Sequence, residues 1–164
     1  MRTLVLMRHA KSDYPEGVVD HGRPLAPRGR REASLAGEWM RENVPAVDAV
    51  LCSSATRTRQ TLARTGVDAP AAFLDRLYGA SPGEMIAEIN RVADEAATLL
   101  VVGHEPTVSQ VALGLAGPPG SDADAVDRIK LKFPTSGIAV LRVPGSWAGL
   151  ELGGAELTTF HVPR

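Results

Sequence analysis

Three short runs of apolar residues, each bounded by polar residues, stand out along the first two thirds of the chain: Thr3–Met7, Val47–Leu51 and Thr98–Val102. Continuous apolar runs of this length are typical of strands that are buried on both faces, as in a parallel sheet. The pattern therefore predicts three central strands.

Helical patterns lie between and after these runs. Apolar residues recur at helical spacing from Pro27 until Pro45, which stops the pattern. Capping residues, prolines and glycines predict three more helices: from Ser53 or Ser54 to about Arg64 with Gly66 after it, from Ser81 to about Ala96, and from near Pro106 to Gly114 or Gly117. Strands that alternate with helices indicate right-handed crossovers.

The last part of the chain has a different pattern. Three further apolar runs, 138–143, 147–152 and 157–162, are separated by Pro-Gly and Gly-Gly turns and predict antiparallel hairpin strands. The turn-rich stretch 117–124 is expected to be a mobile loop. The predicted fold is a three-layer α/β/α architecture with a mostly parallel central sheet and antiparallel C-terminal edge strands. Without repeats or linkers, residues 1–164 are expected to form a single domain.

Composition and net charge argue against several classes of protein and partner. Hydrophobic residues make up 44% and charged residues 23% of the 164 residues, which argues against a disordered chain. The net charge of −1 argues against nucleic acid or an anionic membrane as partner. Residues 1–64, however, hold 11 basic and 7 acidic residues. Of the 18 basic residues, 15 are arginines, which codon bias can explain, but arginine also suits phosphate and carboxylate ligands.

The single cysteine, Cys52, cannot form an internal disulfide, so the sequence does not require an oxidising compartment. The apolar run at the N-terminus is too short for a signal peptide or a membrane span. We therefore expect a cytoplasmic protein.

Polar residues follow each of the three predicted central strands. The first strand leads into Arg8 and His9, the second into the segment from Ser53 to Arg57, and the third into Gly103 and His104. Ligands of open α/β sheets bind outside the carboxyl ends of the strands, so these residues are expected to meet in one crevice. Two of the segments also lead into helix N-termini, which favour anions.

The expected set is typical of phosphoryl transfer. Arg8 and Arg57 can bind phosphate oxygens in bidentate fashion, with His104, Ser12 and Ser53 as further phosphate-binding candidates. A neutral imidazole is a competent nucleophile, and a second, protonated imidazole can donate to a developing oxygen charge. The set therefore predicts a reaction through a phosphohistidine intermediate.

Other kinds of site fit less well. No third ligand lies at a spacing familiar from metal sites, and two arginines would repel a cation, so no metal and no cofactor are expected. A cysteine phosphatase needs five residues between its cysteine and arginine, whereas four separate Cys52 from Arg57 and six separate it from Arg59. Glycine-rich nucleotide-binding loops are absent from the sequence.

Four segments resemble the histidine phosphatase superfamily. Residues 8–12 resemble its Arg-His-Gly signature, with Ala10 in place of glycine, and residues 25–29 resemble the stretch before its first helix. Residues 53–61 resemble the second motif, Ser-x-x-x-Arg-x-x-Gln-Thr, and residues 102–104 resemble the third. The short chain is most similar to the small, SixA-like phosphohistidine phosphatases. The resemblance implies that His9 is phosphorylated, that Arg8, Arg57 and His104 hold the phosphate, and that no metal is needed.

The proton donor departs from the family pattern. Larger members supply an acidic residue, for which the candidates here are Glu84, Glu105 and Asp13, but Glu84 belongs to a predicted capping box with Ser81. Cleavage of an N–P bond releases imidazole and can dispense with a strong acid, so phosphohistidine on a protein is the preferred substrate. A small phosphorylated metabolite and a non-catalytic phosphate-binding module are the alternatives. His21 and His161 are expected to be ordinary surface histidines, although His21 could line the rim of the pocket.

Overall fold

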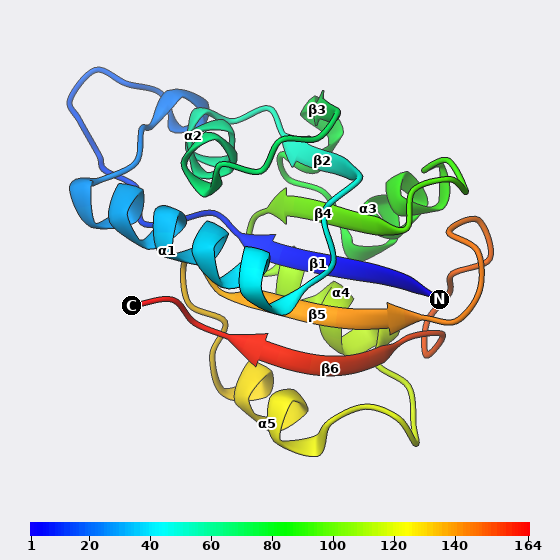
Figure 1. The fold of residues 1–164 in the computed structure, drawn as a ribbon. Coiled ribbons are helices and arrows are strands. Elements are labelled where there is room, and N and C mark those ends of the chain that lie inside the picture. The colour runs from blue at the N-terminus through cyan, green and yellow to red at the C-terminus, as the bar shows by residue number, and fades with distance from the viewer.

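The computed structural model describes residues 1–164 and has one six-stranded sheet with helices on both faces (Figure 1). The strands are β1 (Arg2–Arg8), β2 (Ala49–Ser53), β3 (Ala71–Leu74), β4 (Thr98–Gly103), β5 (Ile138–Val143) and β6 (Glu156–His161). Their order is β3-β2-β4-β1-β5-β6. The first four are parallel, and β5 pairs antiparallel with both β1 and β6. The predicted fold class is confirmed.

Alternate residues of the central strands explain the layers. Leu4 and Leu6 of β1 pack into the apolar cluster beneath α3 (Pro82–Asn90), α4 (Thr107–Leu115) and α5 (Ala123–Leu131). Val5 and Met7 pack into a second cluster on the opposite face, with α1 (Pro27–Asn43) and α2 (Thr56–Thr65). A strand with a core on each face has to be apolar throughout, which is why the sequence pattern identified β1, β2 and β4.

The helix boundaries follow the predicted signals at α1, α2 and α4. Pro27 is the first residue of α1, and Gly66 ends α2 in the left-handed conformation. The prediction for α3 was right at its start but too long, because α3 ends at Asn90 and is followed by turns with i→i−3 hydrogen bonds from the N–H groups of Arg91, Val92 and Ala96. The remaining elements are two 3₁₀ turns, η1 (Asp20–Gly22) and η2 (Asp75–Leu77).

The predicted strand at 147–152 is wrong. Trp147 is fully buried, and its indole N–H donates to the carbonyl oxygen of Ala96 at 2.7 Å. The side-chain amide of Asn90 donates to the carbonyl oxygens of Trp147 and Leu150 at 2.7 and 3.0 Å. The Asn90 side chain and the burial of Trp147 fix the conformation of this segment, so it folds as an irregular connection between β5 and β6.

Two elements were not predicted. The stretch 117–124 runs into α5, whose first turn is capped by Asp122 through a hydrogen bond from the Ala125 N–H at 2.9 Å. Strand β3 lies at the sheet edge with mostly exposed residues, and its four apolar residues, two of them alanines, are too short a run to indicate a strand. No helix is both long enough and apolar enough to cross a membrane.

The helices α1 and α2 pack closely at Gly37. A Cβ atom at Gly37 would lie 2.0 Å from the Thr65 carbonyl oxygen, so Gly37→Ala has to push the helices apart. Overpacking outweighs the gain in helix propensity, and we expect the free energy of unfolding to fall by about 2 kcal/mol or more. Denaturant unfolding measures this, with Gly83→Ala in α3 as the matched control because its Cβ has space. Equal stability of the two variants would contradict the close packing.

Candidate active site

The register of the parallel strands brings the three polar segments together. Arg8 lies opposite Gly103, and Cys52 lies opposite Val102, so Ser53 is level with Gly103. The next residues, His9 and His104, therefore both lie just beyond the carboxyl ends of the parallel strands, and their ring centroids are 5.2 Å apart. The arrows of β1 and β4 in Figure 1 point to this end of the sheet, where α1 begins.

His9 is buried and held in one tautomer. Its Nδ1 lies 2.7 Å from the carbonyl oxygen of Ala10, which can only accept, so Nδ1 bears the proton and Nε2 keeps its lone pair. Burial lowers the pKa of His9 to about 3, and the positive charges nearby act in the same direction. His9 is thus a neutral imidazole at physiological pH.

His104 and Ser53 form the second part of the site. Nε2 of His104 lies 2.8 Å from Oγ of Ser53, which also accepts a hydrogen bond from the N–H of Ala55 at 3.3 Å. Burial and, next, the charge of Arg57 lower the pKa of His104 to about 4. Its Nδ1 is buried and has no hydrogen-bond partner within the protein.

Arg8 and Arg57 place two guanidinium groups beside the histidines. Nη1 of Arg8 donates to the Phe133 carbonyl oxygen at 2.9 Å, and burial lowers the pKa of Arg8 from its usual high value. Arg57, in the first turn of α2, is buried. The buried Nε–H groups of both arginines have no partner within the protein, so both keep hydrogen-bonding capacity for an anion.

The second motif also holds the backbone around His9. The N–H of Ala10 donates to Thr61 Oγ1 at 3.0 Å, and the Thr61 hydroxyl donates to the carbonyl oxygen of Arg57 at 2.7 Å. The side-chain oxygen of Gln60 accepts from the N–H of Leu25 at 2.8 Å. Through these hydrogen bonds, Thr61 and Gln60 of α2 fix the position of the backbone at Ala10 and Leu25, after β1.

Ser12 is buried, but its hydroxyl is engaged elsewhere. It accepts a hydrogen bond from Arg23 Nη1 at 2.8 Å, and Arg23 Nε lies 3.0 Å from Asp20 Oδ1. In this arrangement Ser12 supports the segment that leads to Asp20. Its contact with phosphate stays a prediction.

Three residues at the mouth of the site were not identified as site residues in the sequence. The Asp20 carboxylate accepts from Arg57 Nη2 at 3.1 Å and from the Tyr78 hydroxyl, and its carbonyl oxygen accepts from Arg57 Nη1 at 2.7 Å. Side-chain hydrogen bonds from Tyr78 and then from Arg23 and Arg57 lower the pKa of Asp20. His21 Nε2 lies 3.0 Å from Ser54 Oγ, and the Tyr78 ring packs edge-on against His21 and His104.

Sequence signals for these three residues are weak. His21 shortly follows the first motif, which suggested only a position at the rim, and nothing in the sequence singled out Asp20. The location of Tyr78 depends on the tertiary fold of the turn that carries it. His161, by contrast, stacks on Trp39 with ring centroids 4.6 Å apart.

The acidic candidates for proton donor are mostly committed to helix ends. Glu84 completes a capping box with Ser81, as predicted, and the Ser81 N–H lowers the pKa of Glu84. The Glu105 carboxylate accepts from the N–H and the hydroxyl of Ser109, both at 2.7 Å. Asp13 is exposed, and its side chain makes no hydrogen bond within the protein. None of the three contacts His9 through a hydrogen bond.

Cys52 belongs to the core. It is fully buried in the apolar cluster beneath α1 and α2, and burial raises the pKa of its thiol to about 12. A thiol in this state is not a nucleophile, which agrees with the spacing argument.

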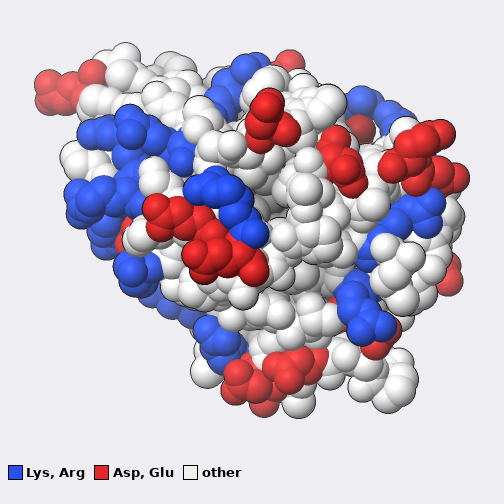
Figure 2. Space-filling model, viewed as in Figure 1, with Lys and Arg blue, Asp and Glu red and all other residues white.

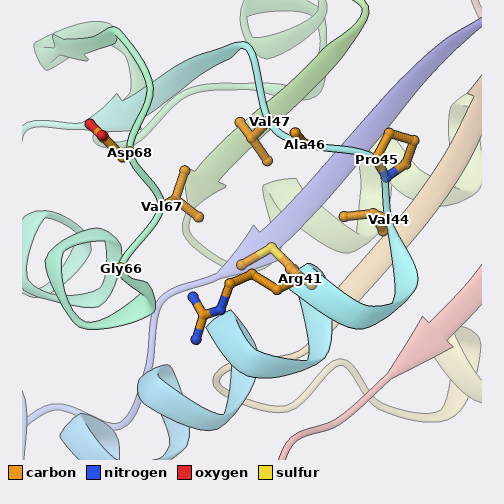
Figure 3. Close-up of a pocket in the computed structure, with 9 residues that line it drawn as sticks. Arg41, Val44, Pro45, Ala46, Val47, Gly66, Val67 and Asp68 are labelled. Carbon is orange, nitrogen blue, oxygen red and sulfur yellow. The ribbon is translucent and has the colours of Figure 1, made fainter.

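The protein has no metal-binding cluster, and its apolar cavity lies away from the histidines. No group of three or more His, Cys, Asp or Glu side chains is arranged to hold a metal ion. A largely apolar cavity of about 260 Å³ lies between the C-terminal ends of α1 and α2, with Arg41 and Val47 in its lining (Figure 3). Val47 precedes β2 and Ser53 ends it. This cavity therefore lies at the amino ends of the parallel strands, opposite the ends that carry the histidines.

Comparison with known proteins agrees with the fold and the motifs. The sequence profile of the histidine phosphatase superfamily (branch 1) matches residues 4–95, which contain the first two motifs. An uncharacterized protein of Mycobacterium tuberculosis (strain ATCC 25618 / H37Rv) is 68% identical over 158 residues, which cover 96% of this chain and 100% of the relative.

Two solved structures are similar over almost their whole length. One, from Nakamurella multipartitia, bears the provisional name phosphohistidine phosphatase SixA; it is 44% identical, has a TM-score of 0.91, and the match covers 99% of this chain and 96% of that chain. The other, from Agrobacterium tumefaciens and with the same provisional name, is 26% identical with a TM-score of 0.81, and 99% of each chain is covered.

The fold and the paired histidines beside two arginines define an α/β phosphatase. The chain belongs to the histidine phosphatase superfamily, branch 1. A reaction that needs no metal ion fits this family.

Proposed function

We propose that this phosphatase removes the phosphoryl group from phosphohistidine on proteins, and that His9 is the nucleophile. One observation carries the proposal: the neutral His9 ring keeps a free lone pair on Nε2 beside two guanidinium groups and a second imidazole. The provisional name of the Nakamurella structure supports the choice of substrate.

The reaction has two steps. Nε2 of His9 attacks phosphorus in line, so that its bond to phosphorus forms while the bond between phosphorus and the substrate imidazole breaks and the leaving nitrogen retains the electron pair. Water then attacks phosphorus, the bond to Nε2 breaks with its electron pair returning to that nitrogen, and inorganic phosphate leaves with both hydrogens of the water. Arg8 and Arg57 neutralise the oxygens, which is the main contribution that a protein makes to phosphoryl transfer.

His104 changes its role with the charge in the site. It is neutral in the free protein because burial and Arg57 keep its pKa at about 4. A phosphate dianion beside it favours the cationic form, so His104 gains a proton and donates to a phosphate oxygen. Ser53, which lies against Nε2 of His104, orients this ring, and Ser12 is a further candidate phosphate ligand.

The leaving group argues for phosphohistidine over a phosphate ester. Glu84 and Glu105 cap helices, and the low pKa of Asp20 keeps it ionised, so none of them is a ready acid for an alkoxide. Imidazole leaves more easily than an alkoxide and has less need of an acid.

A substrate panel tests the proposal. A protein phosphorylated on histidine, a sugar phosphate and an aryl phosphate are compared with and without a chelator. We expect the highest kcat/KM for phosphohistidine and no effect of the chelator. High kcat/KM for a metabolite and none for phosphohistidine would identify a phosphomonoesterase, and no turnover of any substrate would identify a phosphate-binding module.

A further inference from the structure

A groove of about 780 Å³ over the N-terminal half of α1 is lined mainly by arginines, and we refer to it as the arginine groove. Figure 2 shows basic side chains gathered over this end of the molecule, at the left. The groove has one acidic residue in its lining, which consists of Pro27, Arg28, Arg30, Arg31, Glu32, Ser34, Leu35, Arg64 and Arg164.

The positive charge of the arginine groove is largely uncompensated. Glu32 is buried and is shared between Arg28, at 3.5 Å, and Arg164, at 3.1 Å. Arg31 and Arg64 are exposed and have no carboxylate within 4.0 Å. One carboxylate therefore faces five guanidinium groups.

Both walls of the arginine groove are connected to segments that carry active-site residues. Arg64 follows Arg57 by two turns of α2, which is roughly 10 Å along the helix axis. A smaller hollow shares Arg30 and Arg64 with the groove and extends along α2 to Gln60. At the start of α1, the N–H of Ala26 donates to the carbonyl oxygen of Lys11, two residues beyond His9.

We propose that the arginine groove binds an acidic segment of the phosphorylated protein, next to its phosphohistidine. The proposal rests on the proposed function of the site. An extended chain advances about 3.3–3.6 Å per residue, so carboxylates from three to six residues away from the phosphohistidine reach Arg64 and the arginines of α1. A protein segment suits the groove better than nucleic acid because the net charge of the whole chain is −1.

Two synthetic peptides test this proposal. Each has one phosphohistidine, followed from the third residue by three glutamates in one peptide and by three glutamines in the other. We expect the wild type to hydrolyse the acidic peptide with a kcat/KM roughly 3- to 10-fold higher, as a few exposed ion pairs would give, and the preference to fall at high salt. The variant Arg31→Glu/Arg64→Glu should lose the preference and keep wild-type kcat/KM on the glutamine peptide.

The matched control is Lys130→Glu/Arg142→Glu, which reverses two exposed charges outside the groove that also lack a carboxylate partner. It should keep the preference. Equal kcat/KM of the wild type on both peptides, or a preference retained by the groove variant, overturns the groove proposal alone. Loss of binding to a single-stranded oligonucleotide with an unchanged peptide preference assigns the groove to nucleic acid instead. If the wild type hydrolyses neither peptide, the proposed function is wrong and the groove proposal falls with it.

Discussion

Replacing His9 with alanine is expected to lower kcat by roughly 10⁴-fold or more, because removal of a covalent nucleophile leaves only binding and charge neutralisation. The phosphoenzyme should disappear as well. Rapid mixing of wild type with labelled substrate should trap an acid-labile phosphoryl group on the protein, whereas His9→Ala should trap none.

Loss of activity in His9→Ala should not reflect unfolding. His9 lies beyond the end of β1 and belongs to none of the apolar clusters, so the variant should fold with unchanged circular dichroism. His161→Ala is the matched control, since His161 stacks on Trp39 and makes no contact with the other three histidines. Full turnover by His9→Ala, or an acid-labile phosphoenzyme in that variant, would show that His9 is not the nucleophile.

Replacing Arg57 with alanine is expected to lower kcat/KM on a small phosphorylated substrate by roughly 10²- to 10⁴-fold, as the loss of a charge that stabilises the transition state does. Arg57→Lys should recover only part of this activity, because a lysine cannot reproduce the planar fork that bonds to Asp20 and that is proposed to bind phosphate as well. Steady-state kinetics with both variants measures the two effects.

Arg64→Ala is the control for Arg57→Ala, because it removes an exposed arginine two turns further along the same helix. On a small substrate it should leave kcat/KM close to the wild-type value. If Arg57→Ala kept kcat/KM within about fivefold of the wild type, a figure small beside the usual cost of such a charge, Arg57 would not be a phosphate ligand.

The contrast between α3 and the segment after β5 shows which structural features can be predicted locally. The start of α3 was predicted from Ser81, Pro82 and Glu84, since a capping box is complete within four neighbouring residues. The fold of residues 147–152 depends on Asn90 and on the pocket for Trp147, which are distant in the sequence. The apolar residues of that segment, bounded by glycine turns on both sides, fit a strand equally well, so the prediction failed there.

In the active site, too, some features were predictable from the sequence and others depend on the tertiary structure. The sequence by itself determined that His9, Arg57 and His104 follow strands or begin helices, and the order of the motifs identified the family. Only the tertiary structure decided which nitrogen of His9 is free, because the tautomer depends on the position of the Ala10 carbonyl oxygen.

For the arginines, number and charge were predictable from the sequence, whereas their contacts were not. Their number, and the net positive charge of residues 1–64, are properties of the sequence alone. Only the tertiary structure decided that Arg57 bonds to Asp20, that Glu32 is buried under the groove, and that Arg64 lies beside the arginines of α1. The physical reason is range: hydrophobic periodicity and helix caps involve neighbouring residues, whereas ion pairs and the packing of one helix on another depend on the order and register of the sheet.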